Sequence, residues 1–189
     1  MHKDRIKWDR RYSDKAEGEV EAPSPSSFLI DYRCELKPGT VLDLASGDGA
    51  AALYLAQDTQ FIVTAADISE QGLKRLGSFA KLQDVAIQTV CVDLDDKDAM
   101  AKLGSYDNIV ICLFKPSREL LQLLVDHLNP AGKLLLTTFN QQHHRNTGFP
   151  LSYCLSDKEF YRPPTGLNLL KYQVNAELAI DSYLFVAQS

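Results

Sequence analysis

The sequence has no long apolar run and no closely spaced pair of cysteines. No stretch approaches the roughly 18 apolar residues of a membrane-spanning helix, and the charged N-terminal segment MHKDRIKWDRRY lacks the apolar core of a signal peptide. The four cysteines, Cys34, Cys91, Cys112 and Cys154, form no C-x-x-C pair. The sequence therefore predicts neither a metal site nor a disulfide framework, and it favours a cytoplasmic protein.

An excess of positive charge is also missing. Lys and Arg number 20 against 25 Asp and Glu, which gives a formal net charge of −5 and argues against non-specific nucleic-acid binding. Hydrophobic residues make up 45% of the chain, enough for one sizeable core in one domain of ordinary length. We expect a single domain over residues 1–189 with no nucleic-acid or membrane partner, as a monomer or a dimer.

Apolar strands and helical stretches alternate from about residue 40. The pattern predicts strands at 40–45, 61–68, 86–94, 106–114 and 132–139, and helices at 49–57, 69–83, 95–103 and 117–128. The strands are nearly continuous apolar runs, which is typical of a parallel sheet buried on both faces. Such alternation predicts a doubly wound, Rossmann-like α/β fold. Two last strands, at 167–178 and 181–188, have no helix between them and must be antiparallel, which makes a mostly parallel, seven-stranded sheet with an antiparallel C-terminal hairpin.

Two polar segments lie outside this alternation. Residues 1–27 contain Trp8 and Tyr12 at helical i, i+4 spacing, and we expect them to form a helical lid over an α/β core at 28–189. Ordinary packing is the alternative role for the two rings. A polar loop after the fifth strand carries His143, His144 and Arg145, either to bind an acceptor or simply to be solvated. A short helix is expected from about residue 156.

The stretch VLDLASGDGAAALYLA, residues 41–56, contains the first strand and the first turn into a helix. Ligands of open α/β sheets bind at the carboxyl ends of the strands, near this turn. Gly47 and Gly49 let the backbone turn sharply and approach a ligand. Ala45 precedes them, and we expect an extended backbone there because alanine has no unhindered positive φ.

Three acids follow the first three predicted strands. Asp67 is placed to accept hydrogen bonds from ribose hydroxyls, and Asp93 is placed to accept one from an adenine amino group. Asp43, within the first strand, needs a cationic or strongly donating partner. Structural roles remain open for each: Asp43 as the cap of a turn, Asp67 as a helix cap in competition with Ser69, and Asp93 as part of an acidic helix start.

Taken together, these residues resemble the class I S-adenosylmethionine-dependent methyltransferases, in particular the small methyltransferases of the tellurite-resistance and thiopurine methyltransferase-like group. The resemblance is carried by VLDLASGDGAAALYLA, VTAADIS, VDLDD, YDNIVICLF, LNPAGKLLLTTF and the N-terminal KWDRRYS. It implies S-adenosyl-L-methionine as cofactor and a small molecule as methyl acceptor. The implied cofactor-binding residues are Asp43, Ala45, Ser46, Gly47, Gly49, Asp67, Ile68, Asp93, Leu94, Cys112 and Leu113. The candidate acceptor-binding residues are Trp8, Tyr12, Phe114, His143, His144 and Arg145.

Other functions stay open at this point. Gly47, Gly49 and Ala52 also fit the Gly-x-Gly-x-x-Ala pattern of a nicotinamide oxidoreductase, and the fold could bind its cofactor without methyl transfer. No NPPY-type segment is present, which disfavours amino-group methylation of adenine, cytosine or glutamine. No general base is evident, so a soft thiol, selenol or metalloid acceptor fits, because such nucleophiles ionise easily.

Overall fold

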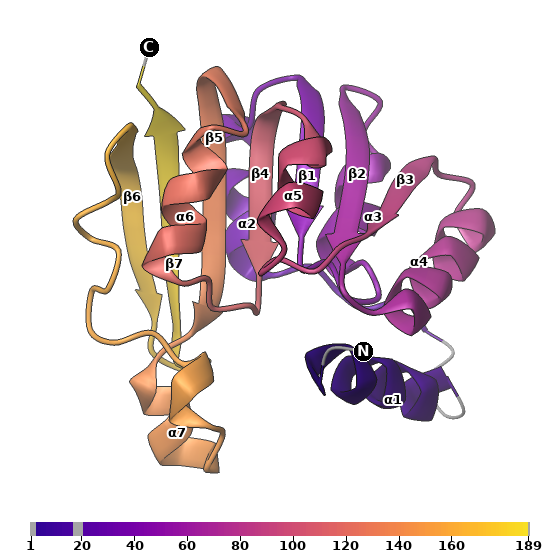
Figure 1. Cartoon of the computed structure of the whole chain (residues 1–189). Helices are drawn as coiled ribbons and strands as arrows, with labels where there is room; N and C mark the ends of the chain where they lie inside the picture. Colours follow the sequence, from indigo (N-terminus) through magenta and orange to yellow (C-terminus); the bar gives the residue numbers. More distant parts are fainter. Residues whose placement is uncertain (1–2, 17–20, 189) are drawn as a thin grey trace.

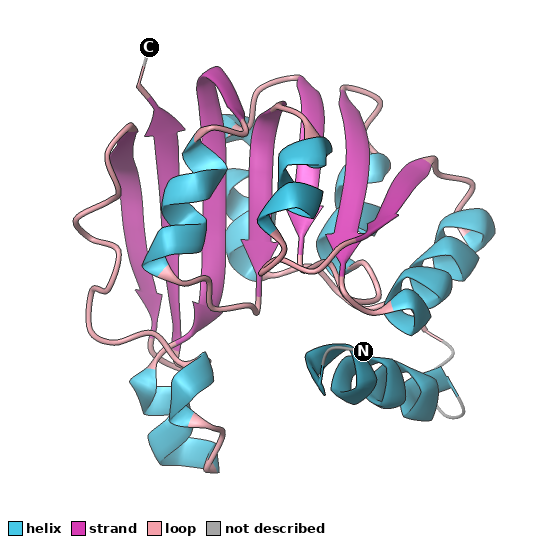
Figure 2. Ribbon diagram, viewed as in Figure 1, coloured by secondary structure: helices cyan, strands magenta, loops and turns pink. Residues whose placement is uncertain are grey.

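The computed structural model of the chain describes residues 3–16 and 21–188. Its strands are β1 (Gly39–Leu44), β2 (Phe61–Asp67), β3 (Ile87–Cys91), β4 (Tyr106–Cys112), β5 (Leu128–Phe139), β6 (Leu167–Asn175) and β7 (Ile180–Ala187). They form one seven-stranded sheet in the order β3-β2-β1-β4-β5-β7-β6 (Figures 1 and 2). The first five strands pair in parallel, and β7 pairs antiparallel with both β5 and β6. The predicted fold class is confirmed.

Helices cover both faces of the sheet. The faces are covered by α2 (Ser27–Tyr32), α3 (Ala50–Ala56), α4 (Glu70–Leu82), α5 (Lys97–Met100) and α6 (Arg118–Val125). The other described helices are α1 (Lys3–Ala16) and α7 (Gln141–Thr147), with short 3-10 turns η1 (Arg33–Glu35), η2 (Ala101–Leu103) and η3 (Leu151–Tyr153). Ser69 and Ser117 cap α4 and α6, because each side chain accepts a hydrogen bond from the N–H three residues on. None of the helices within the described ranges is both long and apolar enough to cross a membrane.

The continuous apolar runs in the strands are explained by two cores, one on each face. In β4, Ile109 and Ile111 belong to the core under α5 and α6, whereas Val110 between them belongs to the core under α2, α3 and α4. All three side chains are fully buried. Successive side chains of a strand point to opposite faces, so a strand covered on both sides needs apolar residues at every position.

Two segments after β5 differ from the prediction. The polar loop that carries His143 is the helix α7, because the Asn140 side chain accepts the Gln142 N–H at its start and Gly148, with φ of 74°, ends it. The helix expected from about residue 156 is absent. Residues 157–160 form turns, and the left-handed backbone of Lys158 (φ 51°) interrupts any helix there.

The carboxyl ends of the five parallel strands meet at one edge of the sheet. In Figure 1 their arrowheads point to the side where α1 and α7 lie, the first near the N-terminus and the second directly after β5. The turn between β1 and α3, which contains the glycines, opens at the same edge. A ligand site at this edge would therefore be covered by α1 and α7.

Candidate cofactor and acceptor site

The turn after β1 has a left-handed backbone at three positions. Gly47 and Gly49 have φ of 56° and 91°, as their lack of a Cβ allows. Ala45 has φ of 56°, so the prediction of an extended backbone there was wrong. The Ser46 N–H donates to the Ala66 carbonyl at 3.1 Å, which holds the turn against β2 and keeps Ala45 in a conformation that costs an alanine about 1–2 kcal/mol.

Asp67, at the end of β2, organises this turn. One of its carboxylate oxygens accepts the Gly47 N–H and the other accepts the Ser69 N–H, both at 2.8 Å. The cap of α4 is Ser69, whose hydroxyl accepts the Gly72 N–H at 3.0 Å. Burial raises the pKa of Asp67, and the two N–H groups oppose that shift. The carboxylate thus holds the glycine turn in place and is not the helix cap.

Asp43 is buried below the same turn, with 1% of its surface exposed. Its Oδ2 accepts the Ala52 N–H at 2.9 Å, so it does cap the first turn of α3. Burial raises the pKa of Asp43 to about 7, with a further contribution from the charge of Asp67. Because two acids lie near each other in a buried place, a cationic ligand group would stabilise both carboxylates.

One polar atom of the turn has no partner. The Ser46 hydroxyl is buried, and no hydrogen bond reaches it from residues 3–16 or 21–188. Asp48, the next acid of the turn, lies 3.4 Å from Lys15 of α1 and from Arg75 of α4. The turn therefore presents strained backbone, an unpaired hydroxyl and an acidic floor, which fits a ligand with a positive charge and polar atoms.

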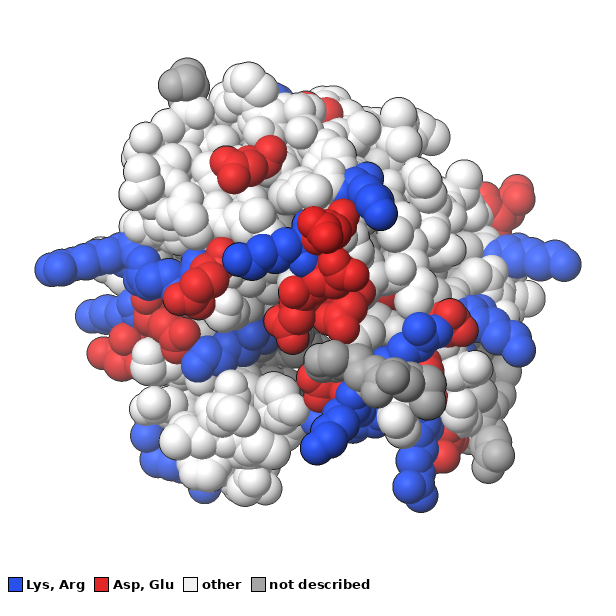
Figure 3. Space-filling view, in the orientation of Figure 1, with Lys and Arg blue, Asp and Glu red and all other residues white. Residues whose placement is uncertain are grey.

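The segment after β3 forms the acidic side of the site. Asp93 is half-buried, and its Oδ1 accepts the Asp95 N–H at 3.1 Å, while Leu94 packs on the core. Ile68, after β2, accepts the Cys91 thiol at 3.6 Å through its carbonyl. In Figure 3 the Asp and Glu side chains gather in the middle of the visible face, with Lys and Arg side chains on several sides of them.

The three residues at the end of β4 and directly after it have different surroundings. Cys112 is held 3.9 Å from the Ser26 hydroxyl, and burial raises the pKa of its thiol, which disfavours the nucleophilic thiolate. Leu113 has φ of 56° and is 56% exposed, an unusual conformation for a large apolar residue. Phe114 packs against the core under α5 and α6.

Helix α1 is docked on the start of α4. Asp9 accepts hydrogen bonds from the Ser69 hydroxyl at 2.7 Å and from the Gln71 N–H at 3.2 Å, and Arg5 forms an ion pair with Glu70. Tyr12 lies directly against Gly47, so that a Cβ on this glycine would overlap the Tyr12 hydroxyl. Helix α1 thereby covers the glycine turn.

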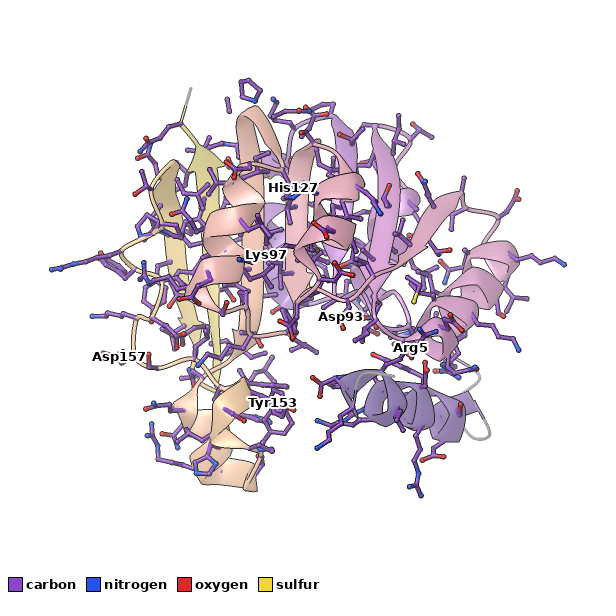
Figure 4. The ribbon with its side chains drawn as sticks, in the orientation of Figure 1. Arg5, Asp93, Lys97, His127, Tyr153 and Asp157 are labelled. Atoms are coloured by element: carbon purple, nitrogen blue, oxygen red, sulfur yellow. The ribbon has the colours of Figure 1, made fainter. Side chains whose placement is uncertain are left out.

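A chain of aromatic contacts continues from α1 to the end of β5. Trp8 stacks near Tyr12 with 6.3 Å between ring centroids, and the Lys7 ammonium, 5.1 Å from the Trp8 ring, donates to the Tyr153 hydroxyl at 2.8 Å. In Figure 4 Tyr153 lies on the side of the α7–η3 unit that faces α1. From Tyr153 the contacts run through Phe149 and His143 to Phe139. We name these residues the aromatic rim: Tyr12, Trp8, Lys7, Tyr153, Phe149, His143 and Phe139.

Comparison with known proteins identifies the proteins that this chain resembles. Residues 41–132 match the family described as "Methyltransferase domain". An S-adenosylmethionine-dependent methyltransferase from Clostridium acetobutylicum has a similar structure, with a TM-score of 0.71 at 15% sequence identity. The match covers 97% of this chain and 99% of that one. TehB from Haemophilus influenzae has a TM-score of 0.66 at 19% sequence identity, and the match covers 96% of this chain and 67% of TehB. No curated protein sequence matches.

Residues 41–132 therefore match a methyltransferase domain, and the whole chain shares its fold with S-adenosylmethionine-dependent methyltransferases. At these identities the solved structures establish the fold and leave the acceptor open. The match covers the glycine turn itself, which favours a methyltransferase over a nicotinamide oxidoreductase.

The residues proposed from the sequence fall into two groups. Asp43, Ser46, Gly47 and Asp67 surround the glycine turn, which Tyr12 covers, and His143 lies in the aromatic rim. Two others bond within the segment after β5: the His144 ring is 2.7 Å from the Phe149 carbonyl, and exposed Arg145 bonds to Gln142. Sequence reasoning missed Lys7, Phe139, Phe149 and Tyr153, because no local pattern brings these segments together.

Proposed function

We propose that the protein transfers a methyl group from S-adenosyl-L-methionine to a small-molecule acceptor at the carboxyl edge of the sheet. The observation that carries this proposal is the glycine turn of the methyltransferase domain, with its unpaired Ser46 hydroxyl, above the buried carboxylates of Asp43 and Asp67. A cofactor that is cationic at both sulfur and amino group suits this acidic, strained turn.

Each end of the cofactor has residues that suit it. Asp67 keeps lone pairs beyond the two that bond the backbone, and these could accept the ribose hydroxyls. Asp93, Leu94 and Ile68 would flank the adenine, beside Asp67. The turn from Ala45 to Gly49, with Asp43 beneath it, would hold the amino-acid end. Cys112 and Leu113, at the neighbouring strand end, would lie near the reactive methyl, which the cofactor supplies already activated by its positive sulfur.

The acceptor would lie between the exposed Leu113 and the aromatic rim. Both are at the carboxyl edge of the sheet, and the bond from Lys7 to Tyr153 joins α1 to η3 across it. A covered site of this kind excludes water and suits a small molecule better than a polymer. Helix α1, within the segment 1–27, would act as a lid that closes over the bound cofactor.

The ease with which the acceptor loses its proton decides which acceptor atoms can attack the methyl group without a base. A thiol or selenol is ionised readily and needs only alignment in line with the carbon–sulfur bond. We retain such soft nucleophiles as one acceptor class, with Cys112 contributing packing only. The cytoplasmic location and the choice between monomer and dimer stay predictions.

Ligand-dependent thermal unfolding tests the cofactor. S-adenosylhomocysteine at a hundredfold excess over its Kd should stabilise the fold by about 2.7 kcal/mol and raise the Tm by a few degrees, whereas NAD should not. A shift with NAD alone would contradict the proposal. Release of S-adenosylhomocysteine with an acceptor panel then separates an enzyme from a protein that only binds the cofactor.

A further inference from the structure

His143 is the one histidine of the aromatic rim, and histidine is the side chain that ordinarily exchanges a proton between pH 5 and 8. Its ring stacks on Phe139 with 3.8 Å between centroids and 13° between planes, and it meets the edge of Phe149 at 5.4 Å. Two rings therefore fix its orientation. No hydrogen bond to either of its ring nitrogens is formed by the described part of the chain.

The neighbouring histidine gives a contrast. His144 uses a ring nitrogen to contact the Phe149 carbonyl at 2.7 Å, so its ring belongs to the internal bonding of the α7–η3 unit. His143 has the same chemistry but keeps both nitrogens available. His144 thus stabilises the α7–η3 unit, whereas a ring nitrogen of His143 can accept a proton from a bound molecule.

The position of His143 is fixed relative to the sheet by a buried carboxylate. Asn140, which caps α7, donates to Asp181 at 2.7 Å, and Asp181 also accepts the Tyr172 hydroxyl at 3.0 Å. Asp181 is 2% exposed and lies in β7 opposite Thr138 of β5. His143 is in the first turn of the helix that this network anchors, so the network fixes where the helix starts relative to β7.

The ring also lies on the correct edge of the sheet. Phe139, on which His143 stacks, is the last residue of β5, and the neighbouring strand β4 ends beside it, where the Leu113 N–H donates to the Thr137 carbonyl at 2.8 Å. The next strand, β1, carries the glycine turn. His143 therefore lies across the strand ends from the place proposed for the cofactor.

We propose that His143 is the general base of the methyl transfer and that the acceptor is a hydroxyl group on a flat, apolar small molecule. This inference rests on the proposed function. An oxygen lone pair of the acceptor forms the new bond to the methyl carbon, the electron pair of the broken carbon–sulfur bond stays on sulfur, and the hydroxyl proton passes to a ring nitrogen of His143. The flat shape follows from the rings that surround the histidine.

Two probes of equal shape test the base. Naphthalene-2-thiol is largely ionised at neutral pH, whereas 2-naphthol keeps its proton, as a tyrosine hydroxyl does. The wild-type enzyme should methylate both. His143→Gln should lower kcat for 2-naphthol by about 10²–10⁴-fold and leave the thiol nearly unchanged, because only the naphthol needs a base. The matched control His144→Gln should change both reactions by the same factor.

Binding gives a readout independent of turnover. Trp8 is the single tryptophan, so quenching of its emission by 2-naphthol in the protein loaded with S-adenosylhomocysteine reports on the rim. The Kd for 2-naphthol should be similar in His143→Gln and wild type. The proposal is overturned if the wild type methylates the thiol alone or neither probe, or if His143→Gln slows both equally. The thermal shift with S-adenosylhomocysteine, measured on the same samples, shows whether the cofactor proposal has failed as well.

Discussion

The two halves of the site are held together in different ways. Around the glycine turn, buried carboxylates accept hydrogen bonds from backbone N–H groups of the strands and helices themselves: Asp67 from Gly47 and Ser69, and Asp43 from Ala52. Over the site, α1 and the α7–η3 unit meet through side chains that are partly exposed, such as Lys7 and Tyr153. The glycine turn is thus held by buried hydrogen bonds to the backbone, whereas the two parts of its cover meet through side chains near the surface.

Because of this difference, we expect substitutions in the turn and in the cover to change the stability of the fold by different amounts. Breaking a buried bond to a carboxylate costs about 1–3 kcal/mol or more, while exposed ion pairs contribute about 0–1 kcal/mol each. Substitutions in the turn should therefore weaken both the cofactor complex and the fold. Substitutions in the cover should affect the acceptor and the mobility of α1 with little loss of stability.

The largest effect is expected at Asp67. Asp67→Ala removes both the bonds to the turn and the proposed ribose contacts, so the Kd for S-adenosylhomocysteine, measured by calorimetry, should rise at least tenfold. Ser69→Ala controls for loss of the α4 cap and of the bond to Asp9, because it removes both but leaves the Asp67 carboxylate in place. An unchanged Kd in Asp67→Ala would make Asp67 purely structural.

Asp43 should make the unliganded fold less stable as pH rises. The folded protein holds a proton on Asp43 up to its pKa of about 7, whereas the unfolded chain releases it near pH 4. The contribution of Asp43 is present below about pH 4 and is lost as pH rises to 7, with a slope of at most about 1.4 kcal/mol per pH unit. Urea unfolding from pH 5 to 8 should show a flatter curve for Asp43→Asn, and equal slopes would contradict the assignment.

Gly47 lies where the two halves touch. Gly47→Ala forces an alanine to φ of 56° and directs its Cβ into the Tyr12 hydroxyl, so it should cost about 1–2 kcal/mol of unfolding free energy and displace α1. In a Tyr12→Ala background only the backbone cost should remain. A double-mutant cycle on unfolding measures the difference, and purely additive effects would show that Tyr12 does not rest on the turn.

The smallest effect on stability is expected at Asp9. Asp9→Ala removes the two bonds that tie α1 to α4, so acrylamide should quench Trp8 more efficiently and turnover should fall. The unfolding free energy should change by less than about 1 kcal/mol. Asp14→Ala, an exposed acid on the same helix, is the matched control. Quenching that stays the same in Asp9→Ala would argue against a detachable lid.

Sequence alone determined the sheet, the glycine turn and the acids around it. The apolar runs and the short connections fix which strands are buried and parallel, and parallel strands bring their carboxyl ends to one edge. Asp43, Gly47 and Asp67 could therefore be placed together before any coordinates. Each follows from its distance in the chain to a strand end, which is local information.

Only the tertiary structure decided the backbone of Ala45, the helix α7 and the aromatic rim. Ala45 is forced to positive φ by a bond between Ser46 and Ala66, on another strand. Lys7 meets Tyr153 across 146 positions of the chain. Such contacts leave no periodic pattern in the sequence, because they join segments that only the completed sheet brings together.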